Sequence, residues 1–324
     1  MTPTRPRRTV ADLAPLARAA LGARSPLTAV SRLRGGSKKG VYRLTLEDST
    51  TAIAYVWAPE EDYWDAPDAD PRDPFSHASG LGLFTAAHDR LVAAGVRTPR
   101  LLHVEEAAGA AVVEDLRGGS LEEALRRDPA TARTALERLG EDLRALRECR
   151  ADGHGKVAVA DAGGSSYGTS CAGLVAGRAL ADIAATTGRD PRVAAARDRL
   201  ETAVRSLADG VGPRASHSLV HGELGPDHVL LDDEGRPALI DIEGLMYFDA
   251  EWEHVFLRLR FGSYYDALRA PGLDEDRLRL YRLAMHLGLV AGPLRLLDGD
   301  FPEAAAMRGI AEHNLAEALT LVGA

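Results

Sequence analysis

One stretch of the chain, from Ser218 to Gly244, constrains the fold more than any other. It holds two short apolar runs, Val229–Leu231 and Ala238–Ile240, separated by an acidic turn segment that ends at Gly235. Apolar runs of this length around a glycine-containing turn predict a β-hairpin. Titratable side chains stand on both sides of the hairpin: His221, Glu223, Asp227 and His228 before the first run, and Asp241 and Glu243 after the second.

A hairpin brings its two ends together, so we expect these six side chains to meet in one small volume. Titratable groups at the ends of apolar strands are costly to bury unless they bind a charged partner. Carboxylate oxygens are preferred ligands of hard divalent cations. The stretch therefore predicts a site for a divalent metal ion, with or without a phosphate group.

Two motifs in this stretch resemble a known family. The segment HGELGPDH at 221–228 is similar to the H-G-D-x-x-x-x-N catalytic loop of aminoglycoside phosphotransferases and choline-kinase-like proteins. The segment IDIE at 240–243 is similar to their I-D-[FW]-[DE] motif, at the matching spacing. Glu223 stands where the family has its catalytic Asp, and His228 stands where it has a metal-binding Asn. The chain thus resembles a divergent member of this family.

The resemblance implies an α+β, two-lobed protein-kinase-like fold. Residues 1–116 are expected to form the nucleotide-binding lobe, an antiparallel sheet plus a helix. Residues 117–324 are expected to form a mostly helical lobe with the catalytic loop and the substrate pocket. The residue patterns agree: apolar residues have helical spacing over 10–23 and 80–95, and residues 27–57 contain three strand-like runs.

Two further strand-like runs, Pro99–Val104 and Ala110–Glu114, follow the second helical segment. The segment Ala111–Leu116 resembles the family's inter-lobe hinge, where backbone groups hydrogen-bond the purine. The resemblance implies that Glu114 and Leu116 contribute to binding a nucleotide, ATP or GTP.

The third strand-like run, Thr51–Trp57, lacks the lysine that kinases use to bind the nucleotide phosphates. The helix predicted over 80–95 correspondingly lacks a glutamate to hold such a lysine. The loop before the second strand resembles that of the with-no-lysine protein kinases, whose phosphate-binding lysine comes from the second strand. This resemblance implies that Lys39 is the functional lysine, with Lys38, or a pocket without a lysine, as the alternatives. A glycine-containing, basic loop can also cover phosphates through Gly36, Ser37, Lys38 and Lys39.

The remaining roles come from the resemblance, position by position. His228, Asp241 and Glu243 are the expected metal ligands, for Mg²⁺ or, because imidazole suits softer ions better, Mn²⁺. Glu223 is expected to orient and deprotonate the acceptor hydroxyl. His221 joins Glu223 and Lys39 among the catalytic candidates, and its expected part is to pack and hydrogen-bond within the loop. Asp249 is the best match to the Asp that supports this loop from behind.

Bulk properties exclude several other classes of protein. The chain has 324 residues and a net charge of −9, which disfavours nucleic-acid binding and favours a cationic partner. No apolar run is long enough to span a membrane, and the N-terminus lacks the apolar segment of a signal peptide. Two cysteines, Cys149 and Cys171, do not make a disulfide framework, so we expect a cytoplasmic protein.

We therefore expect a phosphotransferase acting on a hydroxyl of a small, cationic molecule, either an antibiotic or a metabolite. Carboxylates between Asp249 and Glu253 are expected to suit such a cation. Two alternatives stay open at this point. One is a non-catalytic nucleotide-binding protein of the same fold. The other is a hydrolase, either metal-dependent or built on Ser166 in the G-x-S-x-G segment 164–168.

Overall fold

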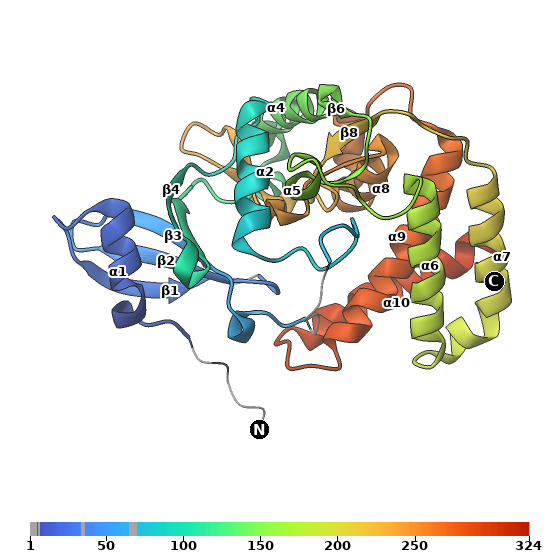
Figure 1. Cartoon of the computed structure of the whole chain (residues 1–324), viewed down its shortest axis with the longest axis horizontal. Helices are drawn as coiled ribbons and strands as arrows, with labels where there is room; N and C mark the ends of the chain where they lie inside the picture. Colours follow the sequence, from blue (N-terminus) through green and yellow to red (C-terminus); the bar gives the residue numbers. More distant parts are fainter. Residues whose placement is uncertain (1–4, 6, 34–35, 65–69, 324) are drawn as a thin grey trace. The chain divides into compact units, whose positions relative to one another are not determined.

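The structure is a computed structural model that describes residues 5, 7–33, 36–64 and 70–323 (Figure 1). The chain forms two compact units, each assembled from separate segments. The first unit contains Met1–Asp70, Phe75–Ala145 and Pro226–Gly244, and the second contains Pro71–Pro74, Leu146–Gly225 and Leu245–Ala324. The lobe boundary expected after residue 116 stays a prediction.

A five-stranded antiparallel sheet forms the body of the first unit, in the order β1-β2-β3-β5-β4. The strand-like runs of the sequence are confirmed. The strands are β1 (Leu27–Arg32), β2 (Gly40–Leu46), β3 (Thr51–Val56), β4 (Leu101–Glu105) and β5 (Ala110–Glu114).

The helix α1 (Val10–Leu21) begins where its sequence predicts a start. Thr9 and Asp12 form a reciprocal capping box that satisfies backbone N–H groups of the first turn. Leu13 and Leu16 of this helix join a buried cluster with Tyr42 and Leu44 of β2. Side chains along β2 alternate between buried and half-buried positions, as expected for a strand with one face against a core.

The predicted hairpin is present in the first unit as β9 (Val229–Leu231) and β10 (Pro237–Leu239), which pair antiparallel. Asp232 organises the turn, because its Oδ1 accepts the backbone N–H groups of Glu234 and Arg236. Gly235 has φ 69°, a left-handed conformation that glycine adopts without strain. The helices of this unit are α2 (Leu81–Ala93), α3 (Leu121–Arg127) and most of α4 (Pro129–Glu148).

The second unit combines a small sheet with helices. The strands β6 (Arg150–Ala151), β7 (Gly155–Lys156), β8 (His217–Val220) and β11 (Met246–Phe248) form an antiparallel sheet in the order β6-β8-β11-β7. The helices α6 (Cys171–Thr187) and α7 (Pro191–Asp209) pack together, and α6 also packs on α9 (Glu275–Leu296). The remaining helices are α5 (Val157–Ala160), α8 (Ala250–Phe261) and α10 (Ala304–Leu321).

The serine-hydrolase hypothesis is wrong. The motif around Ser166 requires a strand directly before it, but Val157–Ala160 forms the short helix α5. The Ser166 hydroxyl instead donates a hydrogen bond of 2.6 Å to the backbone carbonyl of Arg72. Among the described residues, no helix combines the length and the apolar character that crossing a membrane requires.

Candidate active site

Lys39 lies at the centre of the candidate site in the first unit. Its Nζ is 2.7 Å from Oδ1 of Asp241 and 2.6 Å from Oε1 of Glu243, although more than 200 residues separate these groups in sequence. The Nε1 of Trp57, at the end of β3, donates a further hydrogen bond to Glu243. Lys39 is 5% exposed, so this cation is held almost entirely inside the protein.

The charges at this cluster shift the ionisation of both partners. Burial by itself would lower the pKa of Lys39, but the carboxylates of Asp241 and Glu243 outweigh it and raise that pKa above its ordinary value. The Lys39 ammonium in turn lowers the pKa of Asp241 well below its usual range. Lys39 and Asp241 are therefore both charged at neutral pH, and the same ammonium also contacts the carboxyl group of Glu243.

A small hollow opens beside this cluster. The three charged groups line it together with apolar side chains from β3, α2, β5 and the end of the hairpin. These apolar side chains are Tyr55, Phe84, Val113 and Ile240. Apolar walls with a few convergent polar groups are the usual construction of a small-molecule site.

The loop that carries Lys39 is held in place by the segment after β3. The Ser37 hydroxyl accepts a hydrogen bond from Nε1 of Trp64, and the Lys38 carbonyl accepts one from Ser79. Gly36 has φ 76°, and a Cβ there would lie 2.7 Å from the Lys39 carbonyl oxygen, so only glycine fits this turn. Arg34 and Gly35, which the sequence also assigns to this loop, lie outside the described residues.

Asp241 adopts a left-handed backbone conformation with φ 59°, which is uncommon outside glycine. Such conformations cost free energy and cluster at functional sites. Its Oδ2 lies 3.9 Å from Nε2 of His228, so the hairpin brings His228 and Asp241 close together as predicted. Asp241 remains 36% exposed at its side chain, whereas Glu243 is buried.

The predicted hinge residues lie at and after the end of β5. The backbone N–H of Glu114 donates to the Arg100 carbonyl, and its carboxylate accepts the N–H of Arg100. Leu116 is buried. Their proposed contacts to a nucleotide stay a prediction.

His221 and Glu223 belong to the second unit, so their expected meeting with Asp241 stays a prediction. His221 is buried, Glu223 is exposed, and the next residue, Leu224, is buried again. Gly222 has φ 88°, which suits the sharp turn between them. The residues on either side of Glu223 are therefore buried, and the Glu223 side chain lies at the surface of its unit.

Glu253 supports this loop from behind, where the sequence led us to expect Asp249. The Oε2 of Glu253 accepts the backbone N–H of Gly222 at 2.7 Å and also bonds the N–H of His221. Burial raises the pKa of Glu253 to about 7, against the lowering effect of these two N–H groups. No sequence pattern separates Glu253 from its acidic neighbours Asp249 and Glu251.

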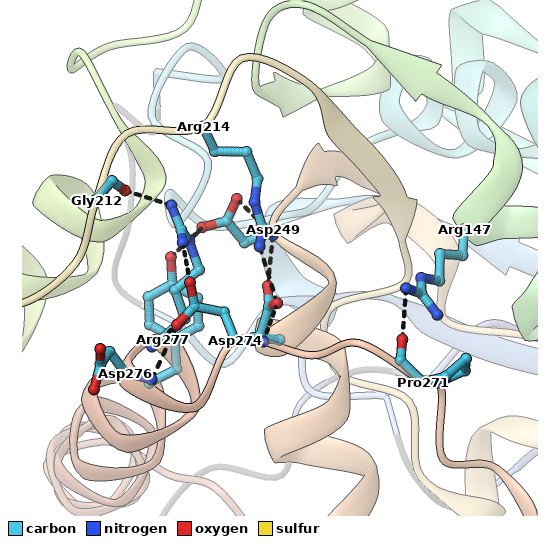
Figure 2. A network of polar contacts seen from close by, with 10 residues as sticks. Arg147, Gly212, Arg214, Asp249, Pro271, Asp274, Asp276 and Arg277 are labelled. Carbon is cyan, nitrogen blue, oxygen red and sulfur yellow. Dashed lines mark hydrogen bonds and ion pairs between the residues drawn. The ribbon is translucent and has the colours of Figure 1, made fainter.

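Asp249 instead belongs to a buried network of the second unit, shown in Figure 2. Arg277 donates to Asp249 at 2.9 Å, and Arg214 lies between Asp249 and Glu251. Glu251 also accepts the backbone N–H of Asp274 at 2.9 Å. The expectation that these carboxylates bind a cationic substrate is wrong for Asp249 and Glu251, because the protein's own arginines neutralise them.

The donor set in the first unit suits Mg²⁺ or Mn²⁺ in one specific way. The ligand atoms of His228, Asp241 and Glu243 do not form a closed cage. Among the described residues, three ligand atoms lie within 4.8 Å of one another only in a different group of side chains. Mg²⁺ usually binds through one or two carboxylates plus substrate phosphates, rather than a cage made by the protein alone. Asp241 and Glu243 fit that requirement.

Comparison with known proteins gives a consistent result. A family model described as the phosphotransferase enzyme family matches residues 30–288. No curated protein sequence matches this chain significantly.

Solved structures of kinases share the fold at low sequence identity. A ternary complex of a thermostable mutant of aminoglycoside phosphotransferase APH(4)-Ia with ADP and hygromycin B is 19% identical, with a TM-score of 0.61 over 90% of this chain and 94% of that one. Choline kinase LicA from Streptococcus pneumoniae is 13% identical, with a TM-score of 0.61 over 96% and 97%. A choline/ethanolamine kinase family protein from Mesorhizobium loti is 18% identical, with a TM-score of 0.59 over 97% and 95%. The α+β, two-lobed kinase-like fold predicted from the sequence is confirmed.

Proposed function

Because this chain belongs to the phosphotransferase enzyme family, we propose that it transfers the terminal phosphoryl group of ATP or GTP to a hydroxyl of a small molecule. The observation that carries the proposal is the contact of Lys39 with Asp241 and Glu243. Phosphoryl transfer needs a cation for the phosphates and carboxylates for a metal ion, and this cluster contains both.

The partial exposure of Asp241 supports a metal-binding role for the acidic pair. One ammonium bonds both carboxyl groups, and Asp241 keeps part of its surface exposed. We assign Asp241, with Glu243 and His228, to Mg²⁺ or Mn²⁺, and Lys39 to the nucleotide phosphates. When bound, the metal ion neutralises charge on the phosphates and helps to align them.

The loop from Gly36 to Lys38 is assigned to covering the phosphates, since it is anchored through Ser37 and Lys38. Backbone groups at Glu114 and Leu116 are assigned to the purine.

Glu223 is assigned to the acceptor hydroxyl, which it orients and deprotonates. Its exposure supports this role, because a base must reach a molecule that arrives from solvent. His221 is assigned to holding the loop in shape rather than to proton transfer, since it is 1% exposed.

Arginines of the protein neutralise Asp249 and Glu251, so these carboxylates do not support a cationic acceptor. The proposal that the acceptor is cationic therefore rests on the net charge of −9 alone. Aminoglycosides, amino alcohols of the choline type and amino sugars are the compounds to screen first.

Thermal unfolding with ATP or GTP, each with Mg²⁺, Mn²⁺ or EDTA, tests nucleotide binding. We expect a metal-dependent rise in melting temperature, because a ligand of the native state stabilises it by mass action. Lys39→Met should weaken the affinity for the nucleotide at least about tenfold, and the rise in melting temperature should be smaller by the corresponding amount. Arg126→Met is the control, because it removes an exposed cation of the same unit that pairs with Glu122, and it should leave the rise nearly unchanged. A rise that is equal in both variants contradicts the role of Lys39.

Turnover separates an enzyme from a protein that only binds nucleotide. Transfer of labelled phosphate to an acceptor should fall at least about 100-fold in Glu223→Gln, with the nucleotide-dependent rise in melting temperature retained. Nucleotide binding without transfer to any acceptor favours the non-catalytic alternative. The absence of any nucleotide effect contradicts both readings.

A further inference from the structure

A second cluster of ligating side chains lies in the second unit, within one compact part of the fold. His154, Cys171 and His217 each offer one ligand atom, and these atoms lie within 4.8 Å of one another. His154 precedes β7, Cys171 is the first residue of α6, and His217 is the first residue of β8. Because Ala151 of β6 pairs with His217, the turn after β6 brings His154 to the same end of the sheet.

Hydrogen bonds leave one nitrogen of each imidazole available. Nε2 of His154 lies 3.1 Å from the carbonyl oxygen of Tyr167, so its Nδ1 is the candidate ligand. His217 is 5% exposed, and its Nδ1 has no hydrogen-bond partner in the structure. The contact of His217 with the Asp152 backbone therefore uses the other nitrogen. Metal-binding histidines are usually held in this way, with the second nitrogen donating to a carbonyl.

The sulfur of Cys171 has a matching environment. Cys171 is 1% exposed, and its sulfur accepts a hydrogen bond from the backbone N–H of Asp249. Burial raises the pKa of this thiol, so without a cation it is a neutral thiol and a poor nucleophile. A reactive cysteine is disfavoured for the same reason, whereas a metal ion would stabilise the thiolate.

We propose that His154, Cys171 and His217 bind one Zn²⁺ or a similar borderline divalent ion. Two imidazole nitrogens and one thiolate are ligands that this class of ion prefers over Mg²⁺ or Ca²⁺. The three ligand atoms lie within 4.8 Å of one another, and tetrahedral zinc places neighbouring ligand atoms about 3.5 Å apart. His154 is the partly exposed member and can adjust to the ion, and a water molecule would complete a site with three protein ligands.

The site has a structural consequence within its unit. The three ligands join the N-terminus of α6 to the sheet that contains β6 and β8. Since α6 packs on both α7 and α9, a bound ion would link the sheet to the helical layer. Only His154 is more than slightly exposed, so the cluster admits an ion and not an organic substrate. The site is independent of the proposed phosphotransfer.

Cobalt titration tests the proposal on chelator-treated, tag-free protein. We expect one Co²⁺ per chain, a thiolate-to-cobalt charge-transfer band in the near ultraviolet and the visible bands of a tetrahedral centre. Zn²⁺ should displace the Co²⁺ and raise the melting temperature by about 5 °C when in about 100-fold excess over its dissociation constant. The absence of the charge-transfer band in the unaltered chain overturns the proposal.

Variants assign the ligands. Cys171→Ser should abolish the charge-transfer band, and His217→Gln should weaken binding at least about 100-fold. Cys149→Ser is the matched control, since it removes the other cysteine of the same unit. His154→Gln alters the partly exposed ligand and so keeps the test valid if a buried variant fails to fold. Asp241→Asn should retain the band, which separates this site from the nucleotide site. Equal binding in His154→Gln and Cys149→Ser overturns the proposal.

Discussion

Two acidic pairs with the same spacing occupy different environments in this protein. Asp241 and Glu243, the lysine-bound pair, lie in the first unit, and Asp249 and Glu251, the arginine-bound pair, lie in the second. The lysine-bound pair has one ammonium for two carboxylates. The arginine-bound pair has two guanidinium groups, from Arg214 and Arg277, and both of its carboxylates are buried.

The difference lies in what neutralises each pair. Two arginines, the Tyr281 hydroxyl and the backbone N–H of Asp274 contact the arginine-bound pair inside its unit, so the pair contributes to structure. The lysine-bound pair has one directly bonded ammonium, a partly exposed Asp241 and a left-handed backbone at that residue. A charged group in a strained, partly exposed position is typical of a binding site. The same Asp-x-Glu spacing thus serves two purposes.

Asp241→Asn gives the largest expected effect and tests the functional half of this comparison. If Asp241 binds the catalytic metal ion, turnover should fall about 10³-fold or more, because electrostatic stabilisation of the transferred group is lost. The melting temperature should change little, since Lys39 keeps its contact with Glu243. Steady-state transfer of labelled phosphate, at saturating metal and nucleotide, measures the effect. A variant with unchanged turnover would remove Asp241 from the mechanism.

Asp249→Asn tests the structural half. The substitution leaves Arg277 and Arg214 buried or half-buried with less compensating charge, and breaking a buried ion pair typically costs about 3–5 kcal/mol. Urea unfolding monitored by fluorescence measures the loss. Activity per folded molecule should stay near that of the unaltered chain. A large loss of turnover with normal stability would make the two pairs alike and break the comparison.

The comparison also explains what the sequence predicts well and what it does not. The hairpin, the sheet of the first unit and α1 follow from local patterns, such as the apolar run Val229–Leu231 and the helical spacing of apolar residues over 10–23. Lys39 was found because its loop resembles a known arrangement, although its partners lie more than 200 residues away. Asp249 and Glu253 were interchanged, because both lie beside α8 and only the packed structure decides which carboxylate reaches Gly222.

Glu253→Gln tests a buried acid whose carboxylate contacts backbone N–H groups, and burial raises its pKa to about 7. A carboxyl whose pKa is higher in the folded than in the unfolded state destabilises the fold as the pH rises between the two values. The unaltered chain should therefore lose about 2–3 kcal/mol of stability from this group between pH 4.5 and about 7, relative to the variant. Urea unfolding of both proteins at pH 5 and pH 8 measures the difference. A constant difference between them would mean that Glu253 stays charged throughout.

Arg214→Lys gives the smallest expected effect and asks whether the arginine-bound pair depends on geometry as well as charge. Arg214 donates from both terminal nitrogens to Glu251, at 2.6 and 3.0 Å. Lysine keeps the charge but cannot reproduce this two-point contact, so we expect a loss of about 1 kcal/mol in urea unfolding. Arg126→Lys is the matched control, because Arg126 makes a single contact to Glu122 at an exposed site and should cost nothing measurable. Equal effects at the two positions would mean that the arginine-bound pair needs only positive charge, as the lysine-bound pair does.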